Sequence, residues 1–428
     1  MESLKLLISA YACEPGKGSE PGVGWRWALE SARLGHEVWV ITRENNRPGI
    51  AAGLAAAGPA AGRMHFVHYD LPPALRRWKR GGRGVHLYYL LWQWGAWRVA
   101  RRLHAEQRFD AVQHLTFGVI RQPSFMGRLG IPFVLGPVGG GERAPLALRR
   151  HFPWRGWLRD GLRDLVNFSV RFDPFVRGMM AQATLILVKT PETLAWLPAR
   201  HRGKAQTMLE IGIDARPDTE QAVVRPAAEG LRLLYVGRFL DLKGMEFGLR
   251  ALAALHARGQ AATLTLIGNG PEARHWQHLA EALGVSASVN WIAWMKHDEL
   301  LAAYAAYDAF VFPSLRDSSG NVVLEAMAGG LPVVCLDLGG PAQMVDASCG
   351  RVVPASGLGE AEVVARLADA LAEFASSAEL VAGLRAGARA RAGQFAWRRV
   401  VARVWGEGGL GYAGVVGDGR RRFVFGHA

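Results

Sequence analysis

The sequence predicts an α/β protein of two domains, each built on a parallel β-sheet with helices between its strands. Short apolar segments, such as 4–10 and 232–236, alternate along the chain with longer segments of helical periodicity. This alternation is typical of parallel strands joined by right-handed crossover helices. At 428 residues, half of them apolar, the chain is also long enough to form two hydrophobic cores.

The first half of the chain supplies the strands and helices of one such domain, predicted to span residues 1–210. Residues 210–230 are polar and contain Pro217 and Pro226, which favours a domain boundary in this range. The expected strands are 4–10, 37–42, 64–69, 111–114, 132–135 and 184–188, and the expected helices are 24–34, 87–107 and 158–172.

The second half repeats the pattern, and a second domain is predicted at 211–393. Residues 394–405 read as a further helix. From residue 406 to 428 the chain is rich in glycine and contains a basic cluster at 420–422, so this tail is expected to be poorly ordered. The expected strands are 232–236, 263–267, 289–292, 309–312 and 332–335, and the last helices of the domain are 360–373 and 379–391.

The apolar segments and the cysteines of the chain indicate where in the cell the protein is expected. No apolar segment approaches the roughly 20 residues that a membrane-spanning helix needs. The three cysteines, Cys13, Cys335 and Cys349, cannot all pair and form no Cys-x-x-Cys motif, as is typical of reduced thiols. We therefore expect a cytoplasmic protein.

Positive charge is concentrated in the first half. The net charge is +14, and residues 1–200 hold 28 Lys and Arg against 14 Asp and Glu, so the second half is neutral. Basic residues mixed with Trp and Tyr at 76–102 and 149–163 favour contact of the N-terminal domain with an anionic membrane surface. The alternative is that Tyr88 to Trp97 is a core-facing helix with basic flanks. Nucleic acid is not an expected partner, because no nucleic-acid-binding module is present.

Two acids lie eight positions apart in a segment that follows an apolar strand at 309–312. Asp317 is in a polar turn, and Glu325 is about a turn into the helix that begins after Gly320. The free amides of Gly320, Asn321 and Val322 would lie between them, at the positive end of the helix dipole. Such a site suits a ligand that carries phosphates and hydroxyls. The alternative is an ordinary capped helix, with Asp317 as a turn residue and Glu325 at the surface.

Two cations follow another strand end. Arg238 and Lys243 come directly after the strand at 232–236, in a loop that opens a helix, so both could bind one diphosphate. A third strand, 263–267, runs into a Gly-rich loop. Because ligands of open parallel sheets bind at the carboxyl ends of the strands, these loops together predict a nucleotide-sugar site.

These motifs resemble those of glycosyltransferase family 4, the group 1 glycosyl transferases. The resemblance covers roughly residues 4–405 and rests on the order and spacing of several segments. Its main elements are Gly237-Arg238…Lys243-Gly244 and Asp317-x7-Glu325, with Asp where the family usually has Glu. Further segments that resemble the family, or a subgroup of it, are 18–25, 136–142 and 209–214.

The resemblance implies a GT-B fold, in which two Rossmann-like domains face each other across a cleft and the helix at 394–405 crosses back to the first domain. It also implies roles. Arg238 and Lys243 would neutralise the leaving diphosphate, Asp317 would orient the donor sugar, and Glu325 would accept hydrogen bonds from the ribose. No cofactor or metal ion is expected, since the chain has no Asp-x-Asp motif.

Three residues of the first half are further candidates. His114 ends the strand at 111–114, where the resemblance implies contact with the reacting sugar; the alternative is a histidine satisfied within the core. Gly18 and Gly22 lie in a predicted loop at 18–24, where the backbone could approach the donor phosphates or the acceptor. The alternative there is an ordinary tight turn.

The sequence therefore predicts a retaining, metal-independent glycosyltransferase. Its donor would be a UDP- or GDP-sugar and its acceptor a lipid-linked or other saccharide, in surface polysaccharide or glycolipid synthesis. The enzyme would be peripheral on the inner face of the cytoplasmic membrane. Two alternatives are a sugar-nucleotide epimerase of the same fold and a non-catalytic protein that binds a membrane or partner.

Overall fold

The computed structural model describes residues 2–76, 84–150, 152–214 and 230–416. Contacts between residues divide the chain into two compact units. The first unit comprises Met1–Gly141, Leu165–Gly212 and Trp397–Ala428, and the second comprises Glu142–Asp164 and Ile213–Ala396. In the described part of the chain, no helix is both long and apolar enough to span a bilayer.

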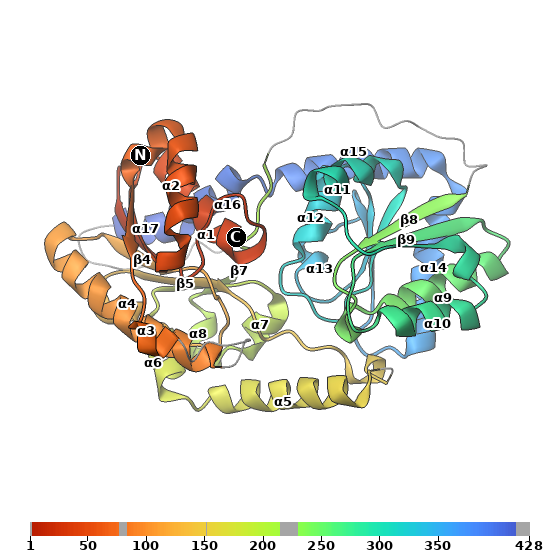
Figure 1. The fold of residues 1–428 in the computed structure, drawn as a ribbon, viewed down its shortest axis with the longest axis horizontal. Helices are drawn as coiled ribbons and strands as arrows, with labels where there is room; N and C mark the ends of the chain where they lie inside the picture. Colours follow the sequence, from red (N-terminus) through yellow and green to blue (C-terminus); the bar gives the residue numbers. More distant parts are fainter. Residues whose placement is uncertain (1, 77–83, 151, 215–229, 417–428) are drawn as a thin grey trace. The chain divides into compact units, whose positions relative to one another are not determined.

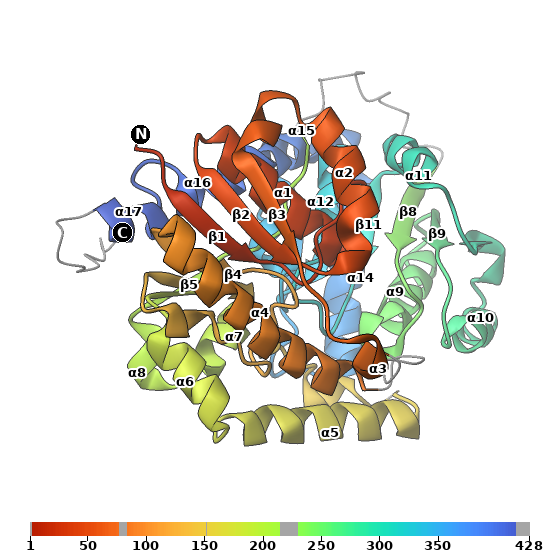
Figure 2. The same ribbon diagram turned by 60° about the vertical axis from the view of Figure 1, so that its left-hand side comes forward.

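A seven-stranded parallel sheet forms the centre of the first unit (Figures 1 and 2). The strand order is β3-β2-β1-β4-β5-β6-β7, so the chain reverses its direction of travel across the sheet between β1 and β4. The strands are β1 (Lys5–Ser9), β2 (Glu37–Thr42), β3 (Met64–His68), β4 (Ala111–His114), β5 (Phe133–Val138), β6 (Leu185–Val188) and β7 (Ala205–Thr207).

Successive side chains of each strand point to opposite faces of this sheet, so both faces are covered by helices. Val112 of β4 packs with α4 and α6 in one hydrophobic cluster, whereas the neighbouring Gln113 accepts a hydrogen bond from Trp405 of α16. The helices of the first unit are α1 (Ser19–Arg33), α2 (Arg47–Ala56), α3 (Pro73–Arg76), α4 (Val85–Gln107), α6 (Pro174–Gln182), α7 (Pro191–Trp196), α8 (Ala199–Arg202), α16 (Trp397–Trp405) and α17 (Leu410–Val416). Helix α5 (Trp154–Val170) begins in the second unit and ends in the first.

The second unit has a six-stranded parallel sheet, and the predicted α/β fold with two such sheets is confirmed. Its order is β10-β9-β8-β11-β12-β13, with the reversal between β8 and β11. The strands are β8 (Leu231–Val236), β9 (Ala262–Ile267), β10 (Val289–Ile292), β11 (Ala309–Phe312), β12 (Val333–Leu336) and β13 (Gly350–Val353). The helices are α9 (Met245–Ala257), α10 (Ala273–Ala282), α11 (His297–Ala303), α12 (Asn321–Ala328), α13 (Pro341–Met344), α14 (Glu360–Ser376) and α15 (Ala378–Gly393).

Helix α16 returns the chain from the second unit to the first, as predicted. Val400, Val401 and Val404 are buried, and Trp405 is fixed at both of its polar groups. Its Nε1 donates to Oε1 of Gln113 over 2.8 Å, and its carbonyl accepts from Nε2 of His36 over 2.7 Å. These bonds hold the end of the helix in place, and its buried valines pack against the first unit.

Three local features differ from the expectations or add to them. The predicted loop at 18–24 is wrong, because α1 begins at Ser19. Pro21 lies in the first turn of the helix, where backbone amides need no intrahelical partner. Helix α17 occupies 410–416, inside the tail expected to be poorly ordered, while 417–428 lie outside the described residues. Residues 142–164, within the predicted domain 1–210, cluster with the second unit.

Three aromatic residues of α4 form core rather than surface. Tyr88, Tyr89 and Trp92 are almost fully buried and belong to the main hydrophobic cluster of the first unit. Their spacing places them on one face of the helix. The core-facing alternative for this segment therefore holds at these three positions. The basic residues predicted just before it, at 77–83, lie outside the described residues.

His114 is part of the same core. Its side chain is 2% exposed, and its Nε2 lies 3.3 Å from the hydroxyl of Tyr89. Its Nδ1 has no hydrogen-bond partner among the described residues. Because burial disfavours the charged imidazolium, the pKa of His114 is lowered from 6.5 to about 4.

We predict that His114 makes the protein less stable in acid. Between pH 6.5 and pH 4 the unfolded chain binds a proton at His114 that the folded protein does not, so the free energy of unfolding falls as the pH falls. The loss between pH 7 and pH 5 is about 2 kcal/mol. Urea unfolding at both pH values measures it in the wild type and in His114→Gln, which cannot titrate.

The variant keeps a smaller slope, because burial also lowers the pKa of His36. An equal pH dependence in both proteins would contradict the prediction.

Candidate functional site

The predicted donor-site residues lie on loops at the carboxyl ends of β8 and β11, where the strand order of the second sheet reverses. After β8 the chain passes Gly237 and Arg238, forms a 3-10 turn at Asp241–Lys243, and enters α9. After β11 it passes through Asp317 and enters α12. This reversal is the position at which open parallel sheets bind their ligands.

Glycines let these loops pack backbone against backbone. A Cβ at Gly244, where φ is +64°, would lie 2.2 Å from the carbonyl oxygen of Pro313, at the end of β11. One at Gly268, after β9, would lie 2.0 Å from the carbonyl oxygen of Gly237. No real side chain tolerates such distances, so glycine is required for three strand ends to meet here.

An ion pair joins the two main loops. Nζ of Lys243 lies 2.5 Å from Oδ2 of Asp317, and both side chains are less than one-fifth exposed. The other carboxylate oxygen accepts from the backbone amide of Ser319 over 3.2 Å. The ammonium group also lies 5.1 Å from the ring centroid of Phe312. The pair therefore places a cation and an acid side by side at the reversal point.

Arg238 differs from Lys243 in its surroundings. It is exposed, and no side chain among the described residues forms a hydrogen bond or ion pair with its guanidinium. Its carbonyl accepts from the hydroxyl of Tyr235 over 3.2 Å, which fixes the backbone at this point. Burial, and the nearby charge of Asp317, raise the pKa of Tyr235, so its hydroxyl stays neutral. Arg238 is thus a cation on a fixed backbone with its charge available to a ligand.

The start of α12 supplies backbone amides beside Asp317. Gly320 caps the helix in a left-handed conformation, with φ of +80°, and no side chain caps the first turn. The amides of Asn321 and Val322 are therefore free of the usual intrahelical partners. Glu325 lies in the second turn of the same helix and is half-buried. Together these groups could bind an anion at the helix start and a hydroxyl one turn later.

The loop that carries Asp317 is also held from behind. The carbonyl of Asp317 accepts from the amide of Gly340 over 2.8 Å. A Cβ at Gly339 would lie only 2.0 Å from that carbonyl oxygen. The position of the carboxylate is thus determined by backbone contacts as well as by Lys243.

The remaining predicted residues lie in the first unit. Gly18 precedes α1 and is exposed, and Gly22 lies within the first turns of α1. A Cβ at Gly22 would be 2.2 Å from the carbonyl oxygen of Lys17, so glycine lets the preceding loop fold onto the helix. His114 is buried beneath Tyr89. The structure therefore brings Arg238, Lys243, Asp317, Gly320, Asn321, Val322 and Glu325 together in the second unit and places Gly18, Gly22 and His114 in the first.

The sequence analysis missed a buried cluster at the strand ends of the first unit. Nζ of Lys189, directly after β6, lies 2.5 Å from Oε1 of Glu210, and both are buried. Glu20, in α1, accepts from the amide of Phe117 just beyond β4. Its pKa is raised by burial, lowered by Lys189 and raised by Glu210, with a net increase. Glu20 and Glu210 lie in segments that resemble the family, and this was the available signal.

One further cluster could offer ligands to a cation. The acceptor atoms of Glu246, Glu272 and His275 lie within 4.8 Å of one another. Nε2 of His275 already bonds to Glu246 over 2.9 Å, and burial raises the pKa of Glu272. Because two of these three side chains already bond to each other, the cluster is not an evident metal site. The expectation that no metal is needed stays a prediction.

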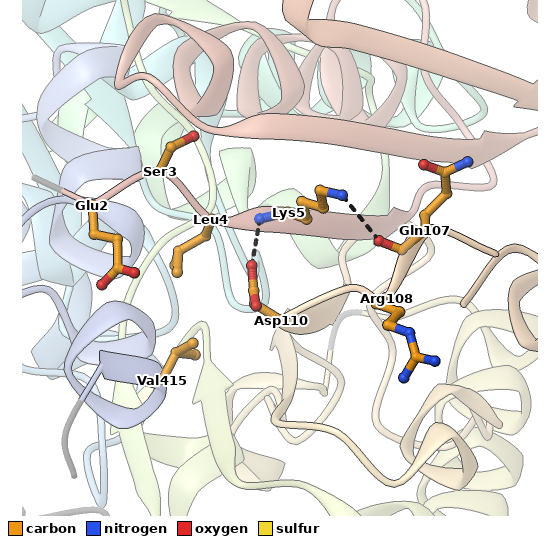
Figure 3. A pocket seen from close by; sticks show the side chains of 8 residues that line it. All are labelled: Glu2, Ser3, Leu4, Lys5, Gln107, Arg108, Asp110 and Val415. Atoms are coloured by element: carbon orange, nitrogen blue, oxygen red, sulfur yellow. Dashed lines mark hydrogen bonds between the residues drawn. The ribbon is translucent and has the colours of Figure 1, made fainter. Parts of the chain in front are cut away.

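A pocket of about 460 Å³ lies at the amino ends of strands β1 and β4 of the first sheet (Figure 3). It surrounds the start of β1, where Asp110 accepts from the amide of Lys5 over 2.7 Å. Gln107, Arg108 and Val415 contribute to its lining. Because it borders the amino ends of the strands, it is not in the usual position of a ligand site in such sheets.

Known families match the second unit most directly. Residues 230–376, about a third of the chain, match the family described as Glycosyl transferases group 1. The D-inositol 3-phosphate glycosyltransferase of Saccharomonospora viridis is 33% identical over 189 residues, 42% of each chain. That of Rhodococcus jostii is 26% identical over 365 residues, 76% of this chain and 72% of the relative. The chain thus spans less than half the length of the first of these relatives.

Solved structures match nearly the whole chain. Sucrose-phosphate synthase from Thermosynechococcus elongatus has a TM-score of 0.60 at 18% identity, covering 93% of this chain and 97% of that one. WaaG, a glycosyltransferase involved in lipopolysaccharide biosynthesis, has a TM-score of 0.52 at 20% identity, covering 94% and 98%. Anabaena HepE in complex with UDP has a TM-score of 0.55 at 15% identity, also covering 94% and 98%.

At such identities these structures bear on the fold alone, which is the two-domain GT-B fold. The family match, the sequence relatives and this fold agree with one another. Residues 230–376 of the chain thus match the group 1 glycosyltransferases, and the chain is similar to those of family 4.

Proposed function

We propose that the protein transfers a sugar from a nucleotide-diphosphate donor to a lipid-linked or other saccharide acceptor. The observation that carries the proposal is the Lys243–Asp317 pair, 2.5 Å apart, beside the exposed Arg238 at the reversal point of the second sheet. Cations, an acid and free helix amides at one place match a ligand with a diphosphate and a hydroxyl-rich sugar.

The donor would bind with its diphosphate between the two cations. Lys243 would exchange part of its contact with Asp317 for a phosphate oxygen, and Arg238 would add a second, bidentate contact. The amides of Asn321 and Val322 would bind further phosphate oxygens. UDP is a suitable nucleotide, because the similarly folded HepE is solved with UDP, and GDP fits the same charge pattern. Glu325 would accept hydrogen bonds from the ribose.

During transfer of the sugar, negative charge develops on the leaving diphosphate. Arg238 and Lys243 stabilise that charge most strongly in the transition state, which is how they would accelerate the reaction. Protein cations at this position, with no Asp-x-Asp in the chain, favour a reaction without a divalent metal. Asp317 would orient the sugar, and the family resemblance implies that the anomeric configuration is retained.

The acceptor is less constrained by the site than the donor. The relatives named above act on D-inositol 3-phosphate, whereas the similarly folded WaaG serves lipopolysaccharide biosynthesis. The excess positive charge of residues 1–200 favours an enzyme at an anionic membrane surface. We therefore favour a lipid-linked acceptor at the inner face of the cytoplasmic membrane, in surface polysaccharide or glycolipid synthesis.

Product analysis tests the proposal and separates it from its alternatives. We expect free UDP or GDP to be released from at least one member of a nucleotide-sugar panel, in excess chelator, with retention at the anomeric carbon by NMR. An epimerase would leave an altered nucleotide-sugar instead, and a binding protein would leave the donor intact. Activity that needs manganese would contradict metal independence, and an inverted product would contradict retention.

We predict that removing either cation slows transfer about 10²–10³-fold, because each one stabilises charge that develops on the leaving group. The variants are Arg238→Ala, Lys243→Ala and the milder Lys243→Gln, which keeps a hydrogen-bond donor beside Asp317. Steady-state kinetics measures the effect. Arg258→Ala, which removes an exposed arginine near the far end of α9, is the matched control and keeps near-normal turnover. Near-normal turnover in both Arg238→Ala and Lys243→Ala would exclude the diphosphate assignment.

We predict that the two acids affect different steps. Glu325→Gln weakens the affinity for UDP or GDP about tenfold, as expected for a lost hydrogen bond to a charged acceptor. Asp317→Asn leaves nucleotide affinity within about threefold and lowers kcat with the true donor, about 10²-fold. Calorimetric titration with the nucleotide and steady-state kinetics measure the two effects. If only Asp317→Asn lost nucleotide affinity, the two roles would be exchanged.

A further inference from the structure

Helix α5 (Trp154–Val170) has its apolar side chains on the outside. Six large apolar residues of this helix are between 53% and 70% exposed: Trp154, Trp157, Leu158, Leu162, Leu165 and Phe168. At about 100° per residue they fall within half of the helix circumference, so they form one continuous face. Single exposed apolar residues are ordinary in soluble proteins, but a continuous face of this kind marks a binding surface.

The side of α5 that faces the protein is polar. Asp160 is buried and pairs with Arg149, 2.8 Å away, and with Arg316. Asn167 is buried and donates to the carbonyl of Gly140 over 2.8 Å. A helix that packs on a globular core normally has the opposite arrangement, with apolar residues inside.

These polar contacts determine which way the helix faces. Arg149 is only 4% exposed and has both Asp160 and Asp164 as partners. Gly156 is equally restricted, since a Cβ there would lie 2.1 Å from Oδ2 of Asp241. Turning the apolar face inward would leave a buried guanidinium without counter-charges, so the helix keeps its apolar face outward.

The charges around the helix are of one sign. In the described part of 142–177, every exposed charged residue is an arginine: Arg143, Arg150, Arg155, Arg159, Arg171 and Arg177. The acids of this range are buried or half-buried, and none of them is exposed. The partner of this surface must therefore offer both an apolar region for the exposed side chains and negative charge for the arginines.

We propose that α5 lies in the headgroup layer of an anionic membrane, with Trp157, Leu162 and their neighbours inserted and the arginines on the lipid phosphates. Amphipathic helices with aromatic residues on one face and basic residues beside it bind such interfaces. A second copy of this chain fits less well, because pairing the face with itself would bring like charges together. The buried Tyr88, Tyr89 and Trp92 of α4 are not part of this surface.

This inference deepens the proposed function by naming the surface that would hold the enzyme beside a lipid-linked acceptor. Vesicle binding is measured without donor or acceptor, and nucleotide release is measured without vesicles. A protein that releases nucleotide but does not bind vesicles overturns the docking surface alone. A protein that binds vesicles without turnover overturns the proposed function alone.

The test is co-sedimentation of the full chain with vesicles of phosphatidylglycerol and phosphatidylcholine, or of phosphatidylcholine alone, across a salt series. We expect binding to the anionic vesicles at low salt, weakened as salt rises, and little binding to the neutral ones. The double variant Trp157→Gln/Leu162→Gln should partition at least about tenfold more weakly. It should keep the thermal unfolding midpoint, since both side chains are exposed.

Trp294→Gln is the matched control. Trp294 is 73% exposed and lies in the second unit but outside α5, so its loss should not change vesicle binding. Equal binding by the wild type and the double variant would overturn the proposal. So would a vesicle-free dimer, seen by sedimentation velocity, that the double variant dissociates, because the face would then be an interface between copies.

Discussion

The ion pair between Lys243 and Asp317 is the interaction on which the charge distribution of the candidate site in the second unit depends. It connects the loop after β8 to the loop after β11 across the point where the strand order reverses. Both groups are largely shielded from water, so each would be costly to bury alone, and removing one partner of a buried pair typically costs about 3–5 kcal/mol. At 16% and 19% exposure this pair is not fully buried, so its cost lies below that range. The same shielding strengthens the field of Lys243 at any anion that enters.

The pair is possible only because the backbone beneath it is closely packed. Gly244 and Gly268 each occupy a position where a side chain would collide with a neighbouring loop, and Gly320 takes up a left-handed conformation just before α12. A requirement for glycine at these strand ends follows from close packing alone. The cations and the acid supply the chemistry on that framework. The elements of the site are thus separable: glycines place the loops, and charged side chains decide what the loops bind.

Many strands and the main loops of the candidate site could be predicted from the sequence. The strands at 37–42 and 309–312 were predicted with their observed bounds because largely apolar segments flanked by polar turns have few other interpretations. Strands β7 and β13 were missed because they are short and partly polar. The start of α1 was misplaced because Pro21 was read as a loop residue. The cluster of Glu20, Lys189 and Glu210 joins residues from distant parts of the chain. Such a contact leaves no local sequence pattern from which it could be predicted. The positions of the loops after β8 and β11 were predictable because each carries its own short motif.

Helix α5 shows the limit of pattern reading most clearly. Its periodicity was visible in the sequence, but periodicity states only that one face is apolar and does not say which face turns inward. That choice depends on partners elsewhere in the chain: Arg149 and Arg316 meet Asp160, and Asp241 leaves room only for Gly156. Arg316 directly precedes Asp317, and Asp241 begins the turn that ends at Lys243. The polar face of α5 therefore contacts both loops of the candidate donor site, while its apolar face is exposed. Two ion pairs make these contacts: Asp160 with Arg316, and Arg159 with Asp241 over 3.6 Å. If a ligand bound at these loops changes the affinity of α5 for a surface, then by linkage that surface changes the affinity for the ligand by the same factor.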